Sequence, residues 1–147
     1  MNRAPTTSLA ERLRHATAAL HGQAEASTLM AALIDGTIDR ATYVELLRNL
    51  QALYVALESA LARHRTDARL AFTNAPHLPR AALIAQDLAA LASDNARTSF
   101  ELAPAAARYV QHLAALAERE PLRLIAHAYV RYLGDLYGGQ QLARGLR

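Results

Sequence analysis

The chain has 147 residues, enough for one domain with its own core, and 52% of them are hydrophobic. It contains no cysteine, which excludes disulfide bridges, thiolate catalysis and cysteine-ligated metal centres. The formal net charge of +3 comes from scattered arginines, since lysine is absent, so the sequence does not indicate nucleic-acid binding.

The N-terminal part of the chain predicts two helices. Residues 1–8 are polar and no apolar run has the length of a bilayer, so we expect a cytoplasmic protein with no membrane span. Ser8 and Glu11 have the spacing of a capping box, and the apolar residues that follow recur at helical intervals. A shorter helical segment over Leu29–Ile34 ends at the turn signal Asp35-Gly36.

The middle of the chain predicts two further helices separated by a loop. Asp39 is placed to cap a long helix with regularly spaced leucines and tyrosines. The polar, proline-containing stretch Arg65–Pro79 is expected to be an irregular loop, and a helix over Ala81–Ala92 follows it. A second loop is expected over Ser93–Leu102.

Prolines mark the starts of the last two predicted helices. Pro104 suits the first turn of a helix over Ala105–Arg119, and Pro121 suits the first turn of a helix that continues to about the end of the chain. Alanine and leucine predominate over β-branched residues. Six helical segments without a strand pattern therefore predict an all-α bundle, in a single domain over residues 1–147.

The last predicted helix contains three glycines, each of which costs about 1 kcal/mol relative to alanine inside a helix. One interpretation is that the helix ends at Gly138-Gly139 as a glycine cap, which leaves Gly134 unexplained. The other is that Gly134 and Gly138, four residues apart on one face, let the backbone approach a flat ligand closely. Asp135 lies beside that face and needs a hydrogen-bond partner in its apolar surroundings. The residue pattern alone favours neither interpretation.

The first predicted helix carries a candidate metal ligand, His21. Glu25 follows it by one helical turn, and Arg14 precedes it by two turns on nearly the same side. A histidine with a carboxylate four residues later is more often a surface pair. The same arrangement also suits an axial iron ligand whose second ring nitrogen is held by a carboxylate, with Arg14 placed to meet a heme propionate.

Other catalytic chemistries have no support in the sequence. It contains neither the Glu-x-x-His pair of di-iron bundles nor a His-Glu-x-x-His zinc motif. No serine stands in a nucleophile elbow, and no glycine-rich phosphate loop follows a strand.

Residues Ala126–Gln140, with the sequence AHAYVRYLGDLYGGQ, closely resemble the distal-helix signature of the biliverdin-producing heme oxygenases. Leu13–Thr17 and Leu20–Glu25 together resemble the proximal-helix segment of that family. Leu53–Glu58 and Ala81–Leu88 are similar to family segments between these two. The resemblance covers nearly the whole chain and implies an all-α, single-domain helical bundle of the heme oxygenase type.

The resemblance implies a role for each proximal residue. His21 would be the ligand of the heme iron, and Glu25 would orient its ring. Arg14 matches a basic residue near the heme propionates.

The resemblance also implies a distal wall. Gly134, Gly138 and Gly139 would lie against the heme face, and Asp135 would hold the water molecules that deliver protons. The positions that match supporting members of this network are Tyr54, Tyr129 and Arg131.

The family's chemistry is then expected. Heme would be both cofactor and substrate, with dioxygen and electrons from an external reductase or ferredoxin, and the products would be biliverdin, carbon monoxide and ferrous iron.

Three features depart from the family pattern. Tyr137 stands where a small residue is common, and Ala18 replaces a basic residue one turn before the ligand. The chain also stops at Arg147, where family members continue through further helices. An apolar face would then be exposed, from which we expect a homo-oligomer.

Three hypotheses remain at this point. An active heme oxygenase is the main one, because His21, Gly134, Asp135 and Gly138 are all present. A heme-binding protein that does not cleave heme, such as a carrier or sensor, is the alternative, and a helical bundle without heme is the third.

Overall fold

The structure is a computed structural model that describes residues 8–91 and 100–145. It divides into two compact units, one of residues 1–38 with 142–147 and one of residues 39–141, and each is described by itself. The described residues form helices and turns without a strand, which confirms the all-α prediction. The single domain expected over residues 1–147 stays a prediction.

The first unit contains helices α1 (Leu9–Glu25) and α2 (Thr28–Ile34). The predicted capping box is present at the start of α1: the backbone N–H of Glu11 donates to the Ser8 hydroxyl, while the Glu11 carboxylate accepts from the Ser8 N–H at 2.7 Å. The predicted turn after α2 is confirmed at Gly36, whose φ of 64° is a conformation that glycine adopts without strain.

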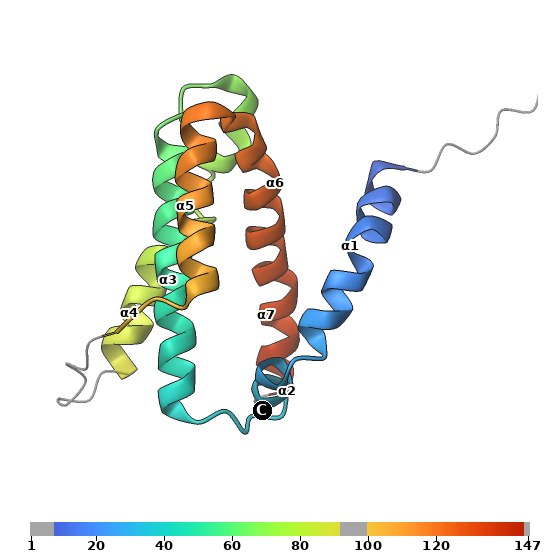
Figure 1. Cartoon of the computed structure of the whole chain (residues 1–147), viewed down its shortest axis with the longest axis vertical. Coiled ribbons are helices and arrows are strands. Elements are labelled where there is room, and N and C mark those ends of the chain that lie inside the picture. The colour runs from blue at the N-terminus through green and yellow to red at the C-terminus, as the bar shows by residue number, and fades with distance from the viewer. Residues whose placement is uncertain (1–7, 92–99, 146–147) are drawn as a thin grey trace, which may run out of the picture. The chain divides into compact units, whose positions relative to one another are not determined.

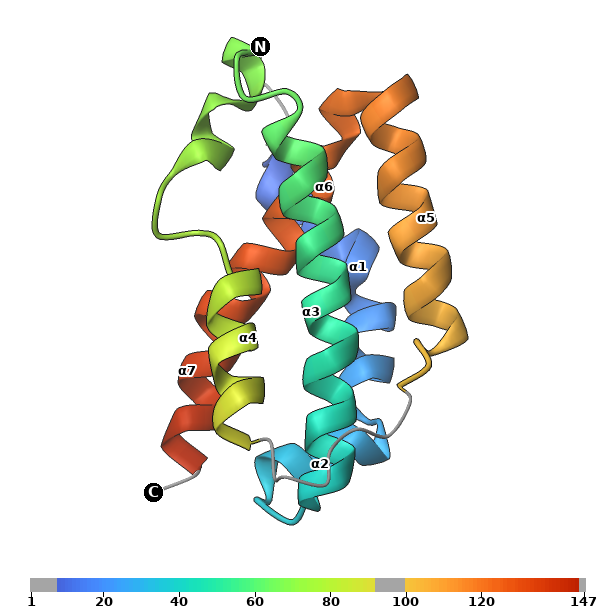
Figure 2. The same cartoon turned by 90° about the vertical axis from the view of Figure 1, so that its left-hand side faces the viewer.

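The second unit is built around the long helix α3 (Arg40–Ala62), which Asp39 caps by accepting from the Thr42 N–H at 3.0 Å. Two helices pack on α3, namely α4 (Ala81–Leu91) and α5 (Pro104–Arg119). Figure 2 shows α4 on one side of α3 and α5 on the other. Pro104 occupies the first turn of α5, as predicted.

The connection between α3 and α4 corrects one prediction. A 3-10 helix, η1 (Ala68–Asn74), lies within the stretch expected to be an irregular loop. It forms because Asp67 caps its first turn by accepting from the Arg69 N–H at 3.0 Å, while Leu70 is fully buried beneath it. Of the second predicted loop, residues 93–99 lie outside the described residues, as does Ala92 at the end of the predicted helix.

The C-terminal segment corrects a second prediction, that of one regular helix from Pro121. The chain instead passes through a 3-10 turn, η2 (Pro121–Arg123), then α6 (Leu124–Ala128), then a π-helical turn, η3 (Tyr129–Leu133), and finally α7 (Gly134–Gly145). In Figure 1 these elements form the red-orange column labelled α6 and α7. A π turn is wider than an α turn and occurs frequently at functional sites.

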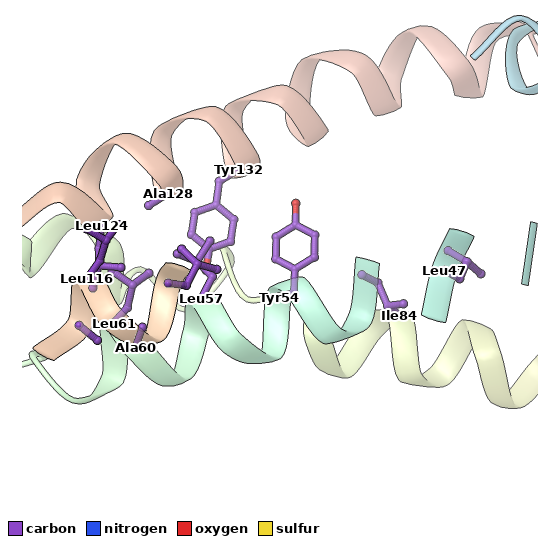
Figure 3. Packing of buried hydrophobic residues seen from close by; sticks show 12 residues of the cluster. Leu47, Tyr54, Leu57, Ala60, Leu61, Ile84, Leu116, Leu124, Ala128 and Tyr132 are labelled. Carbon is purple, nitrogen blue, oxygen red and sulfur yellow. The ribbon is translucent and has the colours of Figure 1, made fainter. Parts of the chain in front are cut away.

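The core of the second unit lies between α3, α5 and the α6–η3 segment. Its largest fully buried side chains are Tyr54, Leu57, Leu70, Leu113 and Leu124. Figure 3 shows Tyr54 reaching from α3 toward the C-terminal segment, and Tyr132 reaching from that segment back toward α3. No helix in the described ranges is long and apolar enough to cross a membrane.

Candidate functional site

Two of the candidates for the distal wall, Arg131 and Asp135, meet at the hydroxyl of Tyr54. Its side chain is only 1% exposed, and its hydroxyl donates a hydrogen bond to Oδ2 of Asp135. The same hydroxyl lies 3.3 Å from the carbonyl oxygen of Arg131. Burial, followed by the hydrogen bond to Asp135, raises the pKa of Tyr54 well above its usual range. The phenol therefore stays protonated, and Asp135 has the hydrogen-bond donor that its sequence position requires.

Two consecutive residues of η3 contact the ring of Tyr54. The guanidinium carbon of Arg131 lies 5.3 Å from the ring centroid, and the ring of Tyr132 stacks on it with centroids 6.0 Å apart and an interplanar angle of 23°. Within the described part of the chain, Nε of Arg131 is buried and has no hydrogen-bond partner. A buried donor of this kind is costly unless a ligand or water molecule occupies the space beside it.

Sequence reasoning missed a neighbouring pair, Tyr109 on α5 and His127 on α6. The Tyr109 hydroxyl and Nδ1 of His127 lie 2.7 Å apart, and the ring of His112 approaches that of His127 at 5.3 Å. Burial, and to a smaller extent His112, lowers the pKa of His127. His127 lies inside the distal signature, but nothing in the sequence shows which residue of another helix meets it.

The glycines of α7 lie inside the helix. Because α7 continues to Gly145, the interpretation of Gly138-Gly139 as a helix cap is wrong. A methyl group added to Gly134, Gly138 or Gly139 would meet no described atom within 4 Å, apart from the nearby backbone of its own helix. Packing within the described chain therefore does not require glycine here, whereas close approach of a ligand to the backbone would.

The proximal candidates belong to α1 of the first unit. Nδ1 of His21 lies 3.2 Å from Oε2 of Glu25, and both side chains are mostly exposed. Among the residues that the structure describes, nothing bonds to Nε2 of His21, so that nitrogen is available as a ligand. Arg14 lies two turns earlier on the same helix. The predicted pairing of His21 with Glu25 is thus present.

Two tyrosines of the stretch Ala126–Gln140, Tyr129 and Tyr137, are exposed rather than buried. Tyr129 is 49% exposed, and its hydroxyl has no hydrogen bond to another described residue, so the structure does not bring this side chain to Tyr54 and Asp135. Tyr137, which departs from the family pattern, is 77% exposed on α7.

Comparisons with known proteins agree with the resemblance in the sequence. A family model described as heme oxygenase matches residues 7–146. Heme oxygenase 2 of Synechocystis sp. is 40% identical over 141 residues, which are 96% of this chain and 56% of that protein. Human heme oxygenase 1 is 37% identical over 137 residues, with 92% of this chain and 48% of that protein covered.

Solved structures give the same result. The crystal structure of Synechocystis heme oxygenase-2 in complex with heme and NO matches with a TM-score of 0.83, covering 96% of this chain and 58% of that one at 40% identity. A heme oxygenase structure from Leptospira interrogans matches with a TM-score of 0.84 at 32% identity, covering 95% and 68%. This chain thus spans about half the length of the curated relatives it matches.

Proposed function

The chain belongs to the heme oxygenase family, and on that premise we propose that it binds heme and opens the ring to biliverdin, carbon monoxide and ferrous iron. The observation that carries this proposal is the set of three glycines inside an unbroken helix, each with open space where a side chain would stand. Asp135, held by Tyr54, lies on the same helix.

His21 would hold the heme through Nε2. Its other ring nitrogen contacts the Glu25 carboxylate at 3.2 Å, and this contact would orient the ring with Nε2 toward the iron. Arg14 would pair with a propionate, since a guanidinium binds carboxylates in a bidentate manner. Bound heme would supply the iron at which dioxygen is activated.

The glycine face of α7 would form a wall against the plane of the heme. Without side chains, Gly134 and Gly138 expose backbone to which a flat ring can come close, and Gly139 extends this surface. We include Tyr129 among the residues that contact the cofactor, because its ring is exposed on the same segment.

Asp135, Tyr54 and Arg131 would hold the water molecules that deliver protons beside this glycine face. Tyr54 remains protonated and donates to one carboxylate oxygen of Asp135, which leaves the other oxygen to accept from water. Nε of Arg131 is a buried donor that such water would satisfy. The three groups therefore suit a small ordered water network.

The remaining expectations belong to the same proposal. Electrons would come from an external reductase or ferredoxin, as implied by family membership. A homo-oligomer is supported by the exposed apolar side chains of the distal segment, Val130, Leu133 and Leu136, and light scattering of the hemin complex tests it. A cytoplasmic location stays a prediction.

The proposal is tested by adding hemin to the purified chain, supplying ascorbate or a reductase in air, and recording the absorption spectrum. We expect a Soret band that depends on His21, followed by conversion to the biliverdin spectrum. A hemin complex that persists unchanged would support the non-cleaving alternative, and the absence of any Soret band would refute both.

A further inference from the structure

Tyr132 is a buried aromatic residue to which the proposed function assigns no role. Its side chain is 4% exposed, and its ring stacks on that of Tyr54. Figure 3 shows the two rings side by side between α3 and the C-terminal segment. Tyr132 is thus the aromatic neighbour of the residue that donates to Asp135.

The π turn explains how Tyr132 reaches this position. Consecutive side chains of an α-helix diverge by about 100°, so only one of two neighbours normally faces a given partner. In η3, both Arg131 and Tyr132 contact the same ring of Tyr54, and Asp135 follows on α7. The wider turn therefore brings three groups of one helical segment onto a single phenol.

The ring of Tyr132, rather than its hydroxyl, makes this contact. No hydrogen bond joins the Tyr132 hydroxyl to another described residue. Tyr132 lines a hollow of about 160 Å³ together with Glu58 and Thr73. Burial and, to a smaller extent, Glu58 raise the pKa of Tyr132 to about 12, so the ring stays neutral at physiological pH. Phenylalanine would keep the stacking contact that tyrosine makes.

We propose that Tyr132 is a positioning residue whose ring fixes the ring of Tyr54, and thereby the hydrogen bond between Tyr54 and Asp135. The ring of Tyr54 is oriented by two side-chain torsions, and a buried ring stacked against it removes the space for alternative orientations. The importance of this positioning for heme cleavage rests on the proposed function. The positioning itself is a property of the chain without heme.

The test uses the full chain without hemin. Proton NMR detects the Tyr54 hydroxyl, identified by its loss in Tyr54→Phe, and saturation transfer measures its exchange with water. Buried hydroxyl protons exchange when the structure opens locally. We expect Tyr132→Phe to leave the exchange rate unchanged, and Tyr132→Leu to raise it by about two- to tenfold, as expected from the loss of one aromatic pair.

Controls separate positioning from general loss of stability. Leu124→Ala removes another fully buried side chain of the same segment and should not raise the exchange rate selectively at Tyr54. If Tyr132→Leu does not fold, Tyr132→Met fills the space without a ring and should give the same increase. Equal exchange in the unsubstituted chain and in the folded variant lacking the ring would overturn the proposal, as would an unprotected hydroxyl in the unsubstituted chain.

The pH profile of heme cleavage gives a second measurement. Tyr132→Phe should keep the profile of the unsubstituted chain, whereas Tyr132→Leu should shift it. Failure of the proposed function would appear as the absence of heme cleavage in the unsubstituted chain, whereas failure of the positioning role would appear in the exchange rates measured without heme.

Discussion

The hydroxyl of Tyr54 donates to the carboxylate of Asp135, 81 residues later in the chain. The bond joins α3 to α7 and lies beside the stacked rings of the core. It therefore links the packing of the second unit to the carboxylate on the glycine-containing helix.

Tyr54→Phe should lower the free energy of unfolding by about 1–3 kcal/mol, because Asp135 would lose its donor while remaining partly buried. Urea unfolding measures this change. Tyr43→Phe is the matched control: Tyr43 lies on the same helix and is partly buried, and its hydroxyl has no hydrogen bond to a described residue, so removing that hydroxyl should change stability by less than about 0.5 kcal/mol. Equal effects of the two substitutions would show that the Tyr54–Asp135 bond contributes nothing.

Gly138→Ala should stabilise the heme-free chain by about 0.5–1 kcal/mol, since alanine is the better helix former and the added methyl group meets open space. The same substitution should weaken hemin binding, because the methyl group would occupy the proposed face. Thermal unfolding and hemin titration measure the two effects. A stabilised variant that binds hemin as tightly as the original would contradict the proposed wall.

Gly36→Ala is a control in which replacing glycine with alanine should lower the stability of the chain rather than raise it. Gly36 has a φ of 64°, which alanine adopts only with strain, so this variant should be destabilised.

Local signals in the sequence were sufficient to predict most helix starts. Ser8, Asp39 and Pro104 act within one helical turn, so their effects can be inferred without tertiary structure. The 3-10 helix η1 was missed because the burial of Leu70 beneath it is a tertiary contact. The π turn η3 was missed because its side chains pack on a residue of a different helix.

The candidate site could be predicted in part for the same reason. The pairing of His21 with Glu25 follows from their spacing along one helix, and the structure confirms it. The donor for Asp135 could not be derived from residue spacing, because Tyr54 lies on a helix distant in sequence. The glycines fitted both a helix cap and a ligand-facing surface until the continuation of α7 excluded the cap.

His21→Ala should abolish the spectrum of an imidazole-ligated heme complex, because Nε2 of His21 is the proposed ligand. Added imidazole should restore that spectrum by occupying the vacated position. His15→Ala is the control, since His15 is an exposed histidine of the same helix. An unchanged Soret band in His21→Ala would assign the ligand to another residue.

His127 should make stability depend on pH in the mildly acidic range. Its pKa is lowered in the folded chain by burial and by His112, so the unfolded chain takes up a proton more readily. The contribution of neutral His127 to the free energy of unfolding is then fully present above the unfolded pKa of about 6.5. It decreases as the pH falls toward the lower pKa of the folded chain.

His127→Gln tests this pH dependence, because it removes the titrating ring. Urea unfolding at pH 7.5 and pH 5 should show a smaller loss of stability in the variant than in the unsubstituted chain. The same loss in both would show that His127 does not contribute.

We propose that this chain cleaves heme, and a single-turnover assay of its hemin complex tests this proposal most directly. The complex is given electrons in air, while trapped carbon monoxide and the absorption spectrum are followed together. We predict that the Soret band decays as carbon monoxide and biliverdin appear, and that Asp135→Ala suppresses both products while hemin still binds. A complex that retains its Soret band and releases no carbon monoxide would contradict the claim.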